Sequence, residues 1–163
     1  MTAAAQSPPP VVEAKIVAAA SAVHPNASLK LAVVAKVTPG YHINDHKPTL
    51  DYLIPTELTL APPPQATVEQ VVYPKGEPKK FAFSDMPLSV YEGSVAIGAL
   101  LKAGRTAKPG VYALQGKLTY QACNDHACLP PASVPVTLTL KVVPRRAPVK
   151  RLNEDVFSRI QFE

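Results

Sequence analysis

Proline is the residue that most restricts what this chain can fold into. It occurs 19 times in 163 residues, which is more than twice its average frequency of about 5%. Each proline inside a helix removes a hydrogen bond and clashes with the preceding turn, so this frequency argues against a helical bundle. Sheet proteins tolerate proline at strand ends, on edge strands and in turns. The prolines therefore favour a fold made of short strands.

Between the prolines, apolar and polar side chains alternate with the two-residue period of a half-buried strand. The segments with this pattern are 29–37, 57–60, 68–72, 88–91, 95–101, 111–122 and 136–142. In the first of them, Lys30 and Lys36 mark the opposite face as wet. Seven to nine such strands predict an all-β fold, an immunoglobulin-like antiparallel β-sandwich with proline-rich loops. The likeness is one of architecture only, because antibody domains carry a buried tryptophan between two cysteines and this chain has no tryptophan.

Length and end composition predict one domain with two flanking segments. At about 150 residues per domain, the chain holds one, which we expect over residues 11–143. Residues 1–10 contain three consecutive prolines and are typical of a flexible leader. Residues 145–151 contribute four of the basic residues behind the net charge of +5. We expect a solvated basic tail or linker over residues 144–163, with a final short strand or helix as the alternative, and no nucleic-acid partner.

The sequence pattern indicates neither a membrane span nor a signal peptide. No run of 18 apolar residues occurs, so the sequence predicts no membrane span. The short alanine run near the start is not long enough for the apolar part of a signal peptide. A processed form of an exported protein would have the same appearance, so this does not fix the compartment.

Two cysteines, Cys123 and Cys128, stand between the two clearest strand patterns with four residues between them. Asn124 and Asp125 are turn formers, so a hairpin should bring the cysteines opposite each other. A disulfide needs α-carbons within about 6.8 Å, whereas five extended residue steps span about 17 Å. The hairpin therefore predicts a pair that is able to bond, at an exposed strand end.

Such a bond suits more than one role. A six-residue ring stabilises a fold by roughly 2 kcal/mol, against nearly 5 kcal/mol for a ring of about a hundred residues. It contributes little as a staple and stays accessible to exchange. From the residues alone, a redox function and a local structural staple are equally open. A metal site formed by Cys123, His126 and Cys128 is a third interpretation, although the spacing matches no common zinc pattern.

His126 lies inside the ring that the bond would close. As a cation it would lower the pKa of a neighbouring thiol, whereas Asp125 beside it would raise that pKa. The alternative is a solvent-exposed loop histidine with no role in the chemistry.

The cysteine segment resembles that of a known family. Residues 120–125 (YQACND), followed by 128–131 (CLPP), are similar to the cysteine motif in the N-terminal periplasmic domain of DsbD-type thiol:disulfide interchange proteins. The segments that follow the family order elsewhere are 40–44, 52–56, 73–74 and 90–93. The resemblance covers roughly residues 28–143, which is most of the chain.

This resemblance implies an immunoglobulin-like fold and a role in electron transfer without a cofactor or metal. It implies that Cys128 forms mixed disulfides with partners and that Cys123 closes the intramolecular bond. A thioredoxin-like domain would supply the electrons, and periplasmic disulfide isomerases or thioredoxins of cytochrome c maturation would receive them. The chain would then be the exported, periplasmic part of a protein-disulfide reductase.

Complete members of the family also have membrane helices and a thioredoxin-like domain, which this sequence lacks. We therefore expect contact with a membrane only through a C-terminal domain outside this sequence, or a stand-alone protein that finds its reductant in trans. The alternative function is a non-catalytic β-sandwich binding module whose disulfide is a local staple.

The family also has a mobile cap loop with an aromatic tip that shields the cysteines. Residues 75–87 lie in the corresponding region, with Phe81 or Phe83 as the shielding ring. The alternative is that both phenylalanines are core residues on one face of a strand. His42 and Asn44 stand where some relatives place aromatic side chains near the cysteines. Alternation puts these two on one face of a strand, and we expect a polar pair on the surface.

Overall fold

The computed structural model describes residues 10–162, and the predicted leader lies outside them except for Pro10. The described residues form eleven antiparallel strands and one helix of four residues. The elements are β1 (Val12–Ala18), β2 (Ser28–Val37), β3 (His42–Asn44), β4 (Glu57–Ala61), β5 (Ala66–Val72), β6 (Glu77–Lys79), β7 (Leu88–Tyr91), β8 (Ser94–Ala103), β9 (Gly110–Tyr120), β10 (Ala122–Cys123), β11 (Ala132–Val142) and α1 (Glu154–Phe157). Within residues 10–162, the one helix is far too short to cross a membrane.

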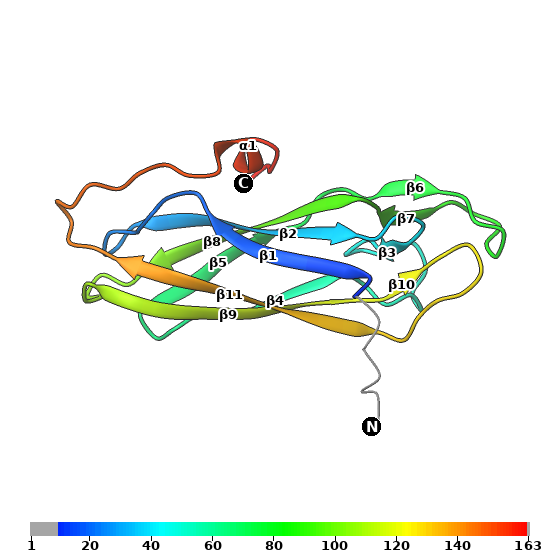
Figure 1. Ribbon diagram of the computed structural model, residues 1–163, viewed down its shortest axis with the longest axis horizontal. Coiled ribbons are helices and arrows are strands. Elements are labelled where there is room, and N and C mark those ends of the chain that lie inside the picture. The colour runs from blue at the N-terminus through cyan, green and yellow to red at the C-terminus, as the bar shows by residue number, and fades with distance from the viewer. Residues whose placement is uncertain (1–9, 163) are drawn as a thin grey trace, which may run out of the picture.

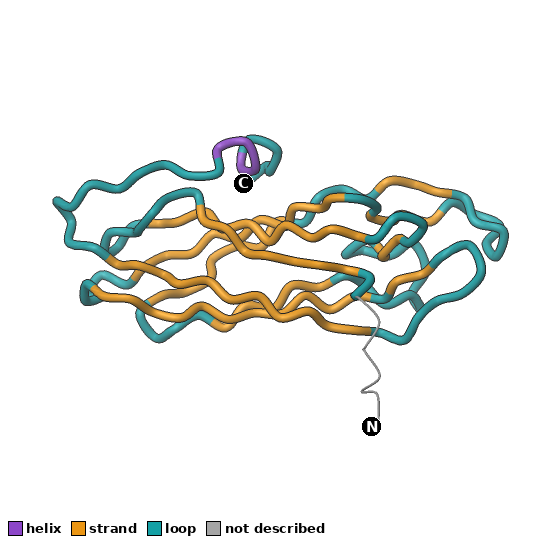
Figure 2. The backbone as a smooth tube through the Cα atoms, viewed as in Figure 1, coloured by secondary structure: helices purple, strands orange, loops and turns teal. Residues whose placement is uncertain are grey.

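The strands form an immunoglobulin-like sandwich, as the alternation predicted. Two sheets, with strand orders β1-β2-β8-β5 and β11-β9-β4, make the two layers. A third sheet, β10-β3-β7-β6, extends the molecule at one end, on the right in Figure 1. Figure 2 shows strands running along the long axis and loops gathered at the two ends. Inward-facing side chains of both layers join in one apolar core, so the sheets position the end loops rigidly.

The pattern of β2 was predicted correctly on its inner face and, for Lys30 and Lys36, on its outer face, where both are exposed. Leu31 and Val33 are buried in the core, as expected. Ala32 points to the other side, yet it is completely buried. The reason is that the end of the chain covers this face, where the Phe162 ring lies 5.0 Å from the Lys30 ammonium group.

Residues 144–162 fold back along the first sheet, above β1 and β2 in Figure 1. Arg151 forms an antiparallel bridge with Ala20 just after β1. On β8, a β-carbon at Gly98 would lie 2.8 Å from Phe162, so the absence of a side chain there permits this packing. Most side chains of residues 144–162 nevertheless stay exposed, and the short helix expected as the alternative is present as α1. The division of the chain at residue 143 stays a prediction.

The strand predicted over residues 111–122 is divided between two sheets. β9 ends at Tyr120 in the second layer, and after Gln121 the chain enters β10 in the third sheet. There Ala122 pairs with Ile43 and Cys123 pairs with His42. This change of sheet carries the cysteine segment to the end of the sandwich and against β3.

Candidate functional site

The two cysteines form a disulfide across a tight hairpin. Their α-carbons are 4.0 Å apart, as the hairpin prediction required. Asn124 shapes the turn, because its side-chain Oδ1 accepts hydrogen bonds from the backbone N–H groups of His126 and Ala127, both at 2.8 Å. The turn residue therefore does what its type predicts: it replaces backbone partners within the loop.

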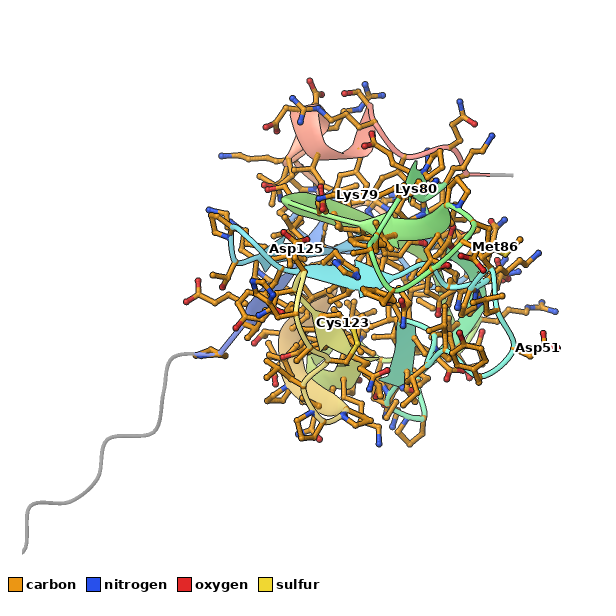
Figure 3. The ribbon with its side chains drawn as sticks, turned by 90° about the vertical axis from the view of Figure 1, so that its right-hand side faces the viewer. Asp51, Lys79, Lys80, Met86, Cys123 and Asp125 are labelled. Carbon is orange, nitrogen blue, oxygen red and sulfur yellow. A yellow bond between two sulfur atoms is a disulfide. The ribbon has the colours of Figure 1, made fainter. Side chains whose placement is uncertain are left out.

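The two half-cystines differ in their exposure to solvent. Cys123 is 2% exposed, whereas Cys128 lies among the exposed residues of the hairpin. Figure 3 looks onto this end of the sandwich, with Cys123 and Asp125 in the hairpin near Lys79 and Lys80. Disulfide exchange depends on which sulfur an incoming thiolate can reach. The arrangement favours attack at Cys128, with Cys123 as the sulfur that leaves.

His42 lies on the strand next to Cys123 and directly opposite it in register. The expected surface location of His42 and Asn44 is wrong, since they are 3% and 2% exposed. They are buried because β3 is an inner strand of the third sheet and because the Phe81 ring covers His42 at a centroid distance of 4.3 Å. The Asn44 side chain donates to the carbonyl of Ile54 at 2.9 Å, so its observed role is to fasten the next loop to β3.

Burial also sets the protonation state of His42. Loss of hydration lowers the pKa of the imidazole below its usual 6.5. The charge of Lys79 also lowers this pKa, whereas the charges of Glu92 and Asp125 raise it. Burial is the largest of these influences. The ring is therefore neutral at pH 7, and it is available to accept a proton.

The two phenylalanines of the predicted cap loop have different environments. Phe81 is 5% exposed and belongs to a small apolar cluster with Leu88 and Val90. Phe83 is 54% exposed and stacks on the outer side of Phe81 at 5.2 Å. Neither lies in a strand, so the alternative of two core residues on one strand face is wrong. A shielding role stays a prediction, and Phe81 is the ring that contacts His42.

A short strand, β6, occupies part of the segment that was expected to be only a loop. It pairs with β7 and brings Lys79 to the edge of the site. The Lys79 ammonium group forms an ion pair with Glu92 and lies 5.7 Å from the Phe81 ring centroid. These contacts tie the base of the loop to the turn that follows β7.

Sequence reasoning did not identify Asp45, which joins three segments beneath the site. Its Oδ2 accepts hydrogen bonds from the Ser89 hydroxyl at 2.7 Å and the Gly76 N–H at 3.1 Å. Its Oδ1 lies 2.9 Å from the Tyr91 hydroxyl. Burial by itself would raise the pKa of Asp45, but hydrogen bonds from Ser89, Lys47, Tyr91 and Gly76 outweigh it and hold the pKa below 3.8. No local pattern signals this carboxylate, because its partners are distant in sequence.

The metal interpretation gains no support from the geometry. The sulfur atoms of Cys123 and Cys128 are bonded to each other and offer no thiolate in this state. His126 is exposed, and its backbone N–H rather than its ring shapes the hairpin. Among the residues described, no three His, Cys, Asp or Glu side chains are grouped as metal ligands would be.

Comparison with known proteins gives a family and two similar folds. The family model for the N-terminal region of the thiol:disulfide interchange protein DsbD matches residues 9–140. The N-terminal periplasmic domain of ScsB from Proteus mirabilis is 17% identical with a TM-score of 0.49, over 77% of this chain and 44% of that one. The Neisseria meningitidis DsbD N-terminal domain in its reduced form is 18% identical with a TM-score of 0.45, over 83% of this chain and 90% of that one.

The chain thus spans less than half of the ScsB domain, and no curated protein matches it in sequence. The family match, by contrast, covers most of the chain and includes both cysteines of the hairpin. This chain belongs to the family of DsbD N-terminal domains, and it is a thiol:disulfide exchange domain with a single cysteine pair.

Proposed function

We propose that this domain works in the periplasm and passes electrons from a thioredoxin-like donor to oxidised partner proteins through Cys123 and Cys128. The observation that carries the proposal is the short ring at the end of the sandwich, in which Cys128 is exposed and Cys123 is buried. A ring of six residues contributes little to stability. An accessible sulfur with a sheltered neighbour is suited to exchange.

The exchange proceeds in two displacements. In the reduced domain, the Cys128 thiolate attacks a disulfide of the partner, one partner thiolate leaves, and a mixed disulfide forms. Cys123 then attacks the Cys128 sulfur, the second partner thiolate leaves, and the Cys123–Cys128 bond closes. The partner gains two electrons and the domain loses two. A dithiol of the thioredoxin-like donor reverses these steps and restores the reduced domain.

In this proposal, Phe81 and His42 form the shield over the buried cysteine. Their stacked rings lie against the strand pair that carries Cys123, and Phe83 extends the stack toward solvent. A partner that binds this end displaces or contacts the exposed Phe83 first. His126, at the exposed tip of the hairpin, contacts the partner rather than the buried sulfur.

The family suggests the partners and the compartment. We propose periplasmic disulfide isomerases or thioredoxins of cytochrome c maturation as electron acceptors, because DsbD-type proteins serve such partners. In this scheme, residues 11–143 form the exchange domain of a protein-disulfide reductase. A membrane-embedded domain would feed the thioredoxin-like donor, and contact with the membrane would occur only through that domain.

Trapping tests this function directly. The Cys123→Ala variant should accumulate mixed disulfides between Cys128 and thioredoxin-like proteins in a periplasmic extract, detected by mass spectrometry. The matched control, Cys128→Ala, should trap none. If neither variant traps a specific protein, the disulfide is a structural staple. A reduction potential of the pair below about −300 mV would lead to the same conclusion, because inert structural disulfides lie in that range.

A further inference from the structure

His42 and Cys123 share one buried space. They are directly opposite each other in the antiparallel pair of β3 and β10, and opposite residues lie on the same face with β-carbons about 4.5–5.5 Å apart. Both side chains are shielded, at 3% and 2% exposure. At that spacing an imidazole reaches a cysteine sulfur on the neighbouring strand.

The ring of His42 is positioned by stacking, and its nitrogens are free. Phe81 packs against it at 4.3 Å. In contrast, Nδ1 of His46 is hydrogen-bonded to the carbonyl of Thr56 at 3.0 Å. Within the described part of the chain, no hydrogen bond involves a ring nitrogen of His42, and neither nitrogen is a fully buried atom left without a partner. Such a ring is held in place and still has a nitrogen available to take up a proton.

The second displacement needs a base at this position. A free cysteine has a pKa of about 8.5, and the thiolate rather than the thiol is the nucleophile. A cysteine that resolves a mixed disulfide at neutral pH therefore has to lose a proton as it attacks. Bulk water does not reach a side chain that is 2% exposed, so the proton needs an acceptor within the protein.

We propose that His42 is the general base for Cys123 in the step that resolves the mixed disulfide. The neutral imidazole takes the proton from the Cys123 sulfur, and that sulfur attacks the sulfur of Cys128. The bond between Cys128 and the partner breaks, and the partner leaves as a thiolate. The imidazolium then gives its proton to that departing thiolate. This inference rests on the proposed function, since it assumes that Cys123 is the resolving cysteine.

Burial, rather than the charged groups around it, keeps His42 in its neutral form. Glu92, Lys79 and Asp125 face it from the turn after β7, from β6 and from the cysteine hairpin. Their effects have opposite signs, and burial leaves the pKa of His42 below 6.5. The base form is therefore present throughout the neutral range and is lost only as the pH falls through this lowered pKa.

The test separates the two displacements in time. The reduced protein is mixed with a small aromatic disulfide, dithionitrobenzoate, and the coloured thiolate is followed. The first release reports attack by Cys128, and the second reports attack by Cys123. The variant His42→Phe retains an aromatic ring for stacking on Phe81 and removes the nitrogens. His42→Gln is the second variant, with polar nitrogens that do not titrate, in case the phenylalanine packs poorly.

Both variants should leave the first release within about twofold of the wild-type rate. The second release at pH 7 should slow by about 100-fold, within the range of general base catalysis. As the pH is raised above 7, the second release in both variants should become about tenfold faster per pH unit, because Cys123 then ionises without a base. It should approach the wild-type rate above the pKa of the Cys123 thiol. Wild-type resolution should stay nearly flat over the same range.

The outcomes distinguish this inference from the proposed function. A wild-type rate and pH profile for the second release in both His42 variants would overturn the role of His42 and leave the exchange function intact. The cysteine variants test the assumption that Cys123 is the resolving cysteine. Cys123→Ala should show only the first release, and Cys128→Ala should lose the fast phase. If the fast phase instead belongs to Cys123, the assignment of the two cysteines is wrong whatever His42 does.

Discussion

Removing either cysteine leaves the chain with a single thiol, and the structure predicts very different reactivities for the two. In Cys123→Ala the remaining Cys128 is on the exposed hairpin. In Cys128→Ala the remaining Cys123 is 2% exposed and lies opposite His42, whose ring Phe81 covers. With the proposed shield in place, a reagent must open the His42–Phe81 stack to reach Cys123, and the free energy of opening sets the difference in rate.

The magnitude follows from the burial of Phe81. Exposing a buried phenylalanine costs about 1.5–3 kcal/mol, and the loss of one aromatic stacking contact adds about 0.5–1.5 kcal/mol. The total is about 3 kcal/mol, and each 1.4 kcal/mol is a factor of ten. Cys123 should therefore react about 100-fold more slowly than Cys128. The Phe81→Ala change should raise the rate of Cys123 by most of that factor.

Alkylation by iodoacetamide, followed by mass spectrometry, measures both rates at several pH values, so that the thiolate fractions can be compared. Unfolding in urea provides the control, because both thiols should then react alike. Equal native rates would refute the reasoning, as would a Cys123 rate that is unchanged by Phe81→Ala. In either case, the His42–Phe81 stack does not shield the buried sulfur.

Three further predictions concern stability. Reduction of the Cys123–Cys128 bond should lower the free energy of unfolding by about 2 kcal/mol, or the thermal midpoint by about 4–8 °C, in calorimetry; a loss twice as large would mean that the ring is a structural staple. Gly98→Val should push Phe162 off β8 and lower the free energy of unfolding by about 1–3 kcal/mol. Limited proteolysis should then cut within residues 144–162 faster in the variant than in the wild type, and equal cleavage of the two proteins would contradict the packing. The lowered pKa of Asp45 gives stability that is fully present above about pH 4 and disappears as the pH falls through the folded pKa. Urea titrations of Asp45→Asn should therefore differ from the wild type at neutral pH and converge with it in acid, and a constant gap would contradict this.

Local patterns in the sequence determined the strands and the cysteine hairpin. On the inner faces of β2, β9 and β11, apolar residues recur with the two-residue period of a strand. The burial of that face fixes the register of each strand. The hairpin depends on turn residues that hydrogen-bond within four positions, as Asn124 does. Such features are encoded by neighbours along the chain, so they could be predicted without knowledge of the fold.

The surroundings of the cysteines were decided by the tertiary structure. His42 reads as a polar strand residue, and it is buried because β10 pairs with it and Phe81 covers it. Asp45 acquires its role from groups that lie 31–46 residues away. Which of Phe81 and Phe83 contacts His42 likewise depended on how the loop folds over β3.

The proline count and the cysteine pair thus determined a β-sandwich and a hairpin able to form a disulfide. Which sulfur is sheltered, which histidine lies opposite it and what covers the outer face of β2 depended on pairings between distant segments. Those pairings are set by the burial of whole sheet faces and loops, a property of the assembled chain that no short stretch of sequence contains.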